Sequence, residues 1–202
     1  MKRLLLALLI GFSMPSYAQE FNQQVLNAFS ASYASESAKD YGKAITDLQP
    51  AYSEGFYEIN LRLGWLNYLL KQYTASEKYY RQAMKLKPSS IEAMFGYINP
   101  VAAELKWADV FMTYQKVLAV DPNHSLANYR IALMYYYRKE FATAEKHLQK
   151  IVERYPFDYD IVLLLAQTKL ALGKTSESKA YYQRALIYSP NNSEIKSVLS
   201  KM

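Results

Sequence analysis

The sequence predicts an all-α fold, an α-solenoid of tandem helical hairpins that ends in a short capping helix. Two observations predict it: prolines recur at a constant interval, and an amphipathic segment precedes each of them. Glycine is rare, at 6 of 202 residues. Hydrophobic residues make up 51% of the chain, which is enough to bury a sizeable core. This composition excludes a disordered or collagen-like chain.

Four of the seven prolines set the period. Pro88, Pro122, Pro156 and Pro190 are equally spaced along the chain. A proline disfavours helical backbone at the residue before it, so we expect a helix to end at each of these positions. Small polar residues follow as candidate N-caps of the next helix, namely Ser89, Ser90, Asn123, Asp158, Asn191 and Asn192.

The segment before each proline has the spacing of an amphipathic helix. Small, aromatic and apolar residues recur three or four positions apart, as in Ser76, Tyr80 and Ala83, which places them on one helical face. A second break is expected within each period, near residues 71–72, 105–106, 139–140 and 173–174. Each period therefore predicts two helices of about 13 residues.

These features resemble the tetratricopeptide repeat, a helix-turn-helix unit of about 34 residues, which is the interval between the prolines. Residues 57–90 match its motif best, through Leu63, Gly64, Tyr73, Ser76, Tyr80, Ala83 and Pro88. The resemblance implies a right-handed solenoid of five units, at 25–56, 57–90, 91–124, 125–158 and 159–192, between an N-terminal lead at 19–24 and a capping helix at 193–202. The unit at 91–124 departs from the motif because Pro100 falls inside its first helix, where it removes the hydrogen bond to Gly96 and is expected to kink the axis.

The first eighteen residues have the form of a secretory signal peptide. Lys2 and Arg3 precede an apolar run at 4–12, and small residues occupy both positions that a signal peptidase reads, Ser16 and Ala18. The apolar run is about half of the roughly 20 residues that cross a bilayer, which disfavours an uncleaved anchor. We therefore expect cleavage after Ala18, a periplasmic or secreted product, and no integral membrane segment in the mature chain.

Composition limits the chemistry of the chain. The absence of Cys excludes disulfides, thiolate catalysis and zinc sites built on cysteine. The formal net charge is +6, and Lys2 and Arg3 contribute two of these charges, so the remainder is too small to imply a nucleic acid partner.

Motifs do not favour an enzyme or a cofactor. The stretch at 173–175 lacks the earlier glycine of a phosphate-binding loop, because Thr168 stands at that position. We assign His124 to a turn between repeats and His147 to a solvent-facing helix surface, both without a ligand partner. Carboxylates and lysines are interpreted as ordinary solvated residues of helix surfaces.

The resemblance also implies a binding surface, because in this family the first helices of successive repeats line a concave face. The family's surface positions carry over to Phe29, Tyr33, Arg62, Trp65, Tyr68, Leu69, Phe95, Asn99, Tyr129, Arg130, Leu133, Tyr136, Tyr137, Leu163, Leu164, Gln167 and Leu170. Trp, Tyr and Arg are the residues most often found at binding hot spots. The alternative interpretation is that these rings complete the core, as aromatic residues at helical spacing commonly do.

The resemblance and this surface predict a non-enzymatic adapter of the cell envelope that binds a peptide or a helix of another protein. Arg62 and Arg130 occupy the same position in their repeats and are expected to orient the bound segment. Two alternatives stay open: a structural subunit of an envelope assembly held by its convex face, and a carbohydrate-binding module whose rings stack on sugars.

Overall fold

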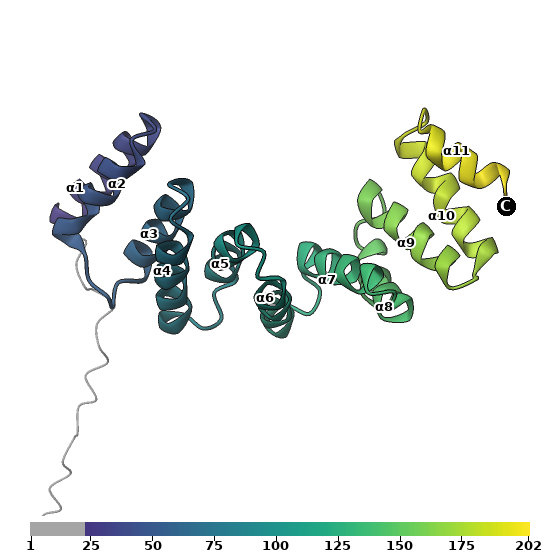
Figure 1. The fold of residues 1–202 in the computed structure, drawn as a ribbon, viewed down its shortest axis with the longest axis horizontal. Helices are drawn as coiled ribbons and strands as arrows, with labels where there is room; N and C mark the ends of the chain where they lie inside the picture. The colour runs from purple at the N-terminus through teal and green to yellow at the C-terminus, as the bar shows by residue number, and fades with distance from the viewer. Residues whose placement is uncertain (1–22) are drawn as a thin grey trace, which may run out of the picture. The chain divides into compact units, whose positions relative to one another are not determined.

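The computed structural model describes residues 23–202, and every secondary-structure element in that range is a helix (Figure 1). The expected signal peptide and its cleavage site lie outside the described residues. The chain divides into two compact units, one ending at Ser53 and the other beginning at Glu54. Within the described range, no helix combines the length and the apolar character that crossing a membrane requires.

The first unit is one helical hairpin. It consists of α1 (Gln23–Ser37), α2 (Tyr41–Leu48) and a 3₁₀ turn, η1 (Gln49–Ala51). Asp40 caps α2, because its Oδ1 accepts the backbone N–H of Lys43 at 3.0 Å.

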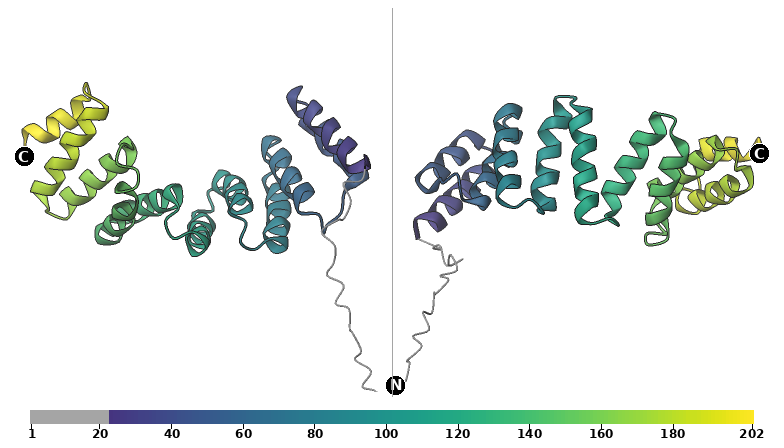
Figure 2. Two further views of the ribbon diagram at one scale, coloured as in Figure 1. Left: turned by 180° about the vertical axis from the view of Figure 1, so that it is seen from behind. Right: turned by 90° about the horizontal axis from the view of Figure 1, so that it is seen from below.

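The second unit contains four hairpins and a final helix. Its elements are α3 (Tyr57–Leu69), α4 (Tyr73–Leu86), α5 (Ile91–Ala103), α6 (Trp107–Val120), α7 (Ser125–Tyr137), α8 (Phe141–Val152), α9 (Tyr159–Ala171), α10 (Thr175–Tyr188) and α11 (Ser193–Ser200). Each helix packs on the next one in the chain, and the hairpins of this unit follow one another in chain order (Figure 2). Two pairs of first helices, α3 with α5 and α7 with α9, are also in contact. This sequential stacking confirms the predicted all-α solenoid.

The turns inside the hairpins fall where the sequence predicts them. Each contains one residue in the left-handed backbone region, with φ between 57° and 74°: Lys39, Lys71, Leu105, Lys139 and Gly173. In the α5–α6 turn, the N–H of Lys106 donates to the Val101 carbonyl at 2.9 Å, the hydrogen bond that closes a Schellman motif. Only one of the five is glycine, the residue that adopts this region without strain.

The helix caps follow the sequence with one correction. Side chains of Ser90, Asp158 and Asn192 accept a backbone N–H at the starts of α5, α9 and α11, as expected. At the start of α7 the cap is His124 rather than Asn123. Helix α7 begins at residue 125, so residue 124 occupies the cap position and its Nδ1 accepts the Ala127 N–H at 3.4 Å.

Small side chains bring the two helices of a hairpin close together. The Ser76 hydroxyl donates to the Gly64 carbonyl at 2.7 Å, and the Ser178 hydroxyl donates to the Ala166 carbonyl at 2.8 Å. All four residues are buried. A side-chain oxygen can reach the backbone of a neighbouring helix only where no larger side chain separates the two helices.

Tyr80 connects α3, α4 and α5. Its ring is 3% exposed and packs against two glycines. A Cβ atom added at Gly64 would lie 2.9 Å from ring carbons, and one added at Gly96 would lie 2.1 Å from Cε1. Burial in this apolar position raises the pKa of Tyr80 above its ordinary value. The missing side chains of Gly64 and Gly96 therefore make the space that the ring fills.

Pro100 lies inside α5, as the sequence predicts, and is buried in its second half. The helix continues past it to Ala103, and the Pro100 carbonyl accepts the N–H of Glu104 at 3.1 Å. The proline thus removes one donor without ending the helix.

We expect Gly96→Ala to destabilise the protein by about 1–3 kcal/mol, because the new methyl group collides with the Tyr80 ring and the backbone must shift. Urea unfolding followed by circular dichroism measures this change. The matched control is Gly42→Ala in α2, where the added Cβ would meet nothing closer than 3.9 Å and is expected to leave stability equal or slightly higher. Equal stability of Gly96→Ala and wild type would contradict the tight fit.

Candidate functional site

The predicted partner-binding residues fall in both units. Phe29 and Tyr33 lie on α1 in the first unit, with their ring centroids 6.3 Å apart. The others lie on the first helices of the four hairpins of the second unit, α3, α5, α7 and α9. We call the surface that these positions form in the second unit the first-helix face.

The first hairpin of the second unit carries one group of rings, the α3 cluster, formed by Trp65, Tyr68 and Tyr73. The Tyr68 ring lies between the other two, 5.8 Å from Trp65 and 6.0 Å from Tyr73 between centroids. Trp65 is 37% exposed, and Leu69 beside the cluster is half-buried. Arg62 is buried and so offers little surface to a partner.

The third hairpin carries a second group, the α7 cluster, formed by Tyr136, Tyr137 and Phe141. The Tyr136 ring lies 5.9 Å from Tyr137 and 5.3 Å from Phe141. Tyr137 is 76% exposed, the most open of the three. Arg130 is exposed one to two turns earlier on α7, with its guanidinium 5.8 Å from the Tyr129 ring centroid.

Helix α5 separates the two clusters and carries short side chains at the equivalent positions. Counted one repeat apart, Asn99, Ala102 and Ala103 correspond to Trp65, Tyr68 and Leu69 on α3 and to Leu133, Tyr136 and Tyr137 on α7. At these positions α5 therefore carries short side chains, which we call the α5 floor, where α3 and α7 carry large ones. The sequence analysis identified the large residues of this face but missed the short ones on α5. It considered only side chains large enough to contact a partner, and Ala102 and Ala103 are not among them.

Several candidates belong to the packing between helices. The Phe95 ring lies 6.0 Å from Tyr114 and 5.1 Å from His124, and Leu164 is only 4% exposed. Tyr129 is half-buried, and burial raises the pKa of its hydroxyl. These residues pack against neighbouring side chains and expose less surface than the two clusters do. On α9, Leu163 and Gln167 are half-buried and Leu170 is exposed.

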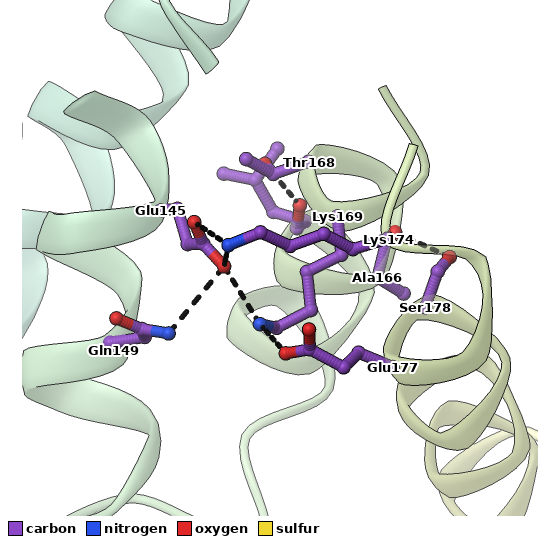
Figure 3. A network of polar contacts seen from close by, with 9 residues as sticks. Glu145, Gln149, Ala166, Thr168, Lys169, Lys174, Glu177 and Ser178 are labelled. Carbon is purple, nitrogen blue, oxygen red and sulfur yellow. Dashed lines mark hydrogen bonds and ion pairs between the residues drawn. The ribbon is translucent and has the colours of Figure 1, made fainter. Parts of the chain in front are cut away.

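A buried ion-pair network joins α8, α9 and α10 (Figure 3). Lys169 on α9 is 2% exposed, and its Nζ lies 2.7 Å from Glu145 Oε1 on α8 and 2.5 Å from Glu177 Oε2 on α10. Lys174 Nζ bonds Glu145 from the other side at 2.8 Å. Burial alone would raise the pKa of the Glu145 carboxyl, but the hydrogen bonds from both lysines outweigh it and lower that pKa. The two lysines and the two glutamates of the network cancel in formal charge. We therefore assign it a structural role, which is to hold the three helices together.

The interpretation of these residues as ordinary solvated charges is thus wrong for Lys169 and Glu145. The spacing of charged residues between repeats could have indicated this network. Glu77 and Lys106 pair across 29 residues, and Glu145 and Lys174 pair across the same interval. Each pair joins the second helix of one hairpin to the turn of the next hairpin. Comparison of equivalent positions between repeats could have found it, whereas inspection of single helices could not.

His147 does not face solvent as expected; it is half-buried between α7 and α8. Its Nδ1 lies 2.9 Å from Asn128 Oδ1, and its ring stacks on Tyr135. The Asn128 amide nitrogen donates to the carbonyls of Pro122 and His124, so Oδ1 is the acceptor and His147 Nδ1 carries the hydrogen. Burial lowers the pKa of His147.

Other charged groups form local ion pairs. Arg81 lies 3.5 Å from Glu77 and 3.9 Å from Asp109, and its side chain is exposed. We therefore assign this basic side chain to the solvated surface of α4. Within residues 23–202, no group of three or more His, Asp or Glu side chains is placed to hold a metal ion.

Comparisons with known proteins agree with this architecture. Tetratricopeptide repeat models match residues 57–90 and 135–202, which together make up half of the chain. No curated protein is significantly similar in sequence.

Solved structures share the fold at low identity. A tetratricopeptide repeat protein from Parabacteroides merdae is 18% identical with a TM-score of 0.73, over 89% of this chain and 72% of that one. MamA from Desulfovibrio magneticus is 13% identical with a TM-score of 0.69, over 86% and 99%. YrrB, described as a tetratricopeptide repeat protein with an unusual peptide-binding site, is 10% identical with a TM-score of 0.68, over 90% and 94%.

We expect Lys169→Met to destabilise the protein by about 2 kcal/mol or more, because it removes the central cation from a buried network. Lys174→Met is the matched control: its side chain is 41% exposed, so the loss should stay below about 1 kcal/mol. Chemical unfolding of the two variants measures the difference. Equal losses would show that the burial of Lys169 has no energetic consequence.

We expect stability to fall as the pH drops below about 6.5, the ordinary pKa of histidine. The folded state holds His147 at a lowered pKa, so the unfolded chain binds its proton more readily and gains stability from acidification. His147→Asn retains an N–H donor for Asn128 but does not titrate. Thermal melts between pH 7.5 and 5 should show a shallower decline for this variant, and parallel curves would contradict the assignment.

Proposed function

The chain belongs to the tetratricopeptide repeat family, and from this premise we propose that it is a non-enzymatic adapter that binds a peptide segment or helix of a protein partner on the first-helix face. One observation carries the proposal: the first-helix face carries aromatic clusters on α3 and α7, and the equivalent positions of α5, the helix between them in the chain, hold only short side chains. Such a surface offers apolar contact on two sides and room for a chain between them.

The chemistry of this face suits a peptide with apolar side chains. Tyr and Trp supply large contact area, and their polar atoms can remain hydrated or bond a peptide backbone. Over Asn99, Ala102 and Ala103 a bound backbone can approach α5 closely. Arg130 is exposed beside the α7 cluster and can bind an acidic group of the partner, whereas the burial of Arg62 leaves Arg130 as the better candidate for orienting it.

The proposed location is the cell envelope. The signal-peptide features of residues 1–18 support export and a periplasmic or secreted adapter, whose partners are then envelope proteins.

We expect peptides selected from a phage-displayed library on the mature chain to lose affinity when the face is altered. Tyr137→Ala and Arg130→Glu should each raise Kd about tenfold or more, as removal of a binding hot spot does. Ala103→Trp should also abolish binding, because it fills the floor with a ring while residue 103 is exposed and tolerates a large side chain. Isothermal titration calorimetry measures each Kd.

The matched control is Ala119→Trp, the same change at an exposed position of α6. It should leave Kd unchanged. Peptides that bind all four variants as tightly as wild type would exclude the first-helix face as the binding site.

A further inference from the structure

The turn between α5 and α6 breaks two local rules of folding. Leu105 adopts the left-handed region at φ 57°, where a side chain is strained, and it is 69% exposed. Trp107, the first residue of α6, is 54% exposed. Neither the turn geometry nor the burial of apolar surface accounts for these two residues.

Equivalent turns in the second unit share this backbone geometry but carry different side chains. Their residues at the same two positions are Lys71 and Tyr73, Lys139 and Phe141, and Gly173 and Thr175. Tyr73 and Phe141 pack on Tyr68 and Tyr136 of the preceding helix. On α5 the equivalent residue is Ala102, so Trp107 has no such ring to pack on, and about half of its surface is exposed.

We call Leu105, Lys106 and Trp107 the α5–α6 tip. Contacts with the adjacent hairpins place the neighbouring turns on either side of the α5–α6 tip. Lys106 pairs with Glu77 in the first half of α4, which brings the α3–α4 hairpin next to it. On the other side, the Arg138 guanidinium of the α7–α8 turn lies 4.8 Å from the Phe111 ring centroid on α6. The hairpins accordingly lie side by side in both views of Figure 2.

The flanking turns are basic. Lys71, Arg138 and Lys139 form no ion pair with any acidic residue in the described part of the chain, and Glu140 is the acidic residue beside them. At the tip itself, Lys106 is neutralised by Glu77 and Glu104. Two exposed apolar side chains therefore lie between two turns of net positive charge.

We propose that the α5–α6 tip binds the surface of an anionic lipid bilayer, with Leu105 and Trp107 in the interfacial layer and Lys71, Arg138 and Lys139 facing the lipid phosphates. Trp favours the interface because it combines an apolar ring with a polar N–H, and basic residues add attraction to anionic headgroups. Two exposed apolar side chains between basic turns match the layered chemistry of an anionic bilayer surface, whereas a small-molecule ligand would need a concave pocket. Two inserted side chains predict weak, reversible binding.

This inference goes beyond the adapter function and does not depend on it. A membrane-bound tip would hold the protein at a bilayer surface whether or not the first-helix face has a partner.

The test uses the chain from residue 19 onward, because the apolar run at 4–12 would bind lipid by itself. Vesicles of phosphatidylcholine alone are compared with vesicles that also contain phosphatidylglycerol, by co-sedimentation at low and physiological salt. The chain has two tryptophans, so Trp65→Phe leaves Trp107 as the only tryptophan emitter. We expect enrichment on the anionic vesicles, weakened by salt, with a blue shift of Trp107 emission.

Leu105→Gly/Trp107→Thr is the decisive variant, since it takes the residues found at the same positions of the α9–α10 turn and should fold at least as well as wild type. We expect at least a tenfold loss of vesicle partition. Lys71→Gln/Lys139→Gln should lose several-fold on anionic vesicles only. The control is Phe157→Asn, which removes a 77% exposed ring at a position where other repeats carry Asn123 and Asn191, and should not change partition.

No enrichment on anionic vesicles would overturn the proposal, and so would undiminished binding of the Leu105→Gly/Trp107→Thr variant. Because no peptide is present in this experiment, its failure is independent of any failure of the adapter function.

Discussion

The structure of the second unit depends on the places where side chains are missing. Tyr80 can enter the space between α3 and α5 only because Gly64 and Gly96 have no Cβ, and Ser76 can reach the Gly64 carbonyl for the same reason. Once these helices are held at that distance, equivalent residues of successive hairpins fall on one face. The aromatic clusters of α3 and α7 and the short side chains of α5 stand at such equivalent positions.

Ion pairs between hairpins add a second constraint of a different kind. Burying Lys169 with Glu145 contributes little net stability compared with apolar packing, because both charges must leave water. A misaligned stack, however, would leave a buried charge without a partner, which is strongly unfavourable. The recurring pair of Glu77 with Lys106 ties an earlier hairpin in the same register. Apolar contacts thus provide the stability of the stack, and the ion pairs oppose wrong alignments.

Repetition made much of the fold predictable from the sequence. Helix breaks near residues 71, 105, 139 and 173 and the caps at Ser90, Asp158 and Asn192 follow from local rules that act within one repeat. The rest depends on contacts between segments. Lys169 is buried by three helices at once, and His147 is covered by Asn128 and Tyr135. Gly96 on α5 matters through a ring that the preceding helix, α4, supplies. No periodicity within one helix reports such contacts.

Helix α5 links the two surfaces that the proposals concern. The single replacement of an aromatic residue by Ala102, where α3 and α7 carry Tyr68 and Tyr136, has two effects. It leaves a short side chain at the middle of the first-helix face, and it removes the ring on which the first residue of the next helix would pack. Trp107 is left exposed as a result, next to Leu105 in its strained turn. The hairpin that departs most from the repeat therefore supplies both the short side chains of the floor and the exposed apolar residues of the tip.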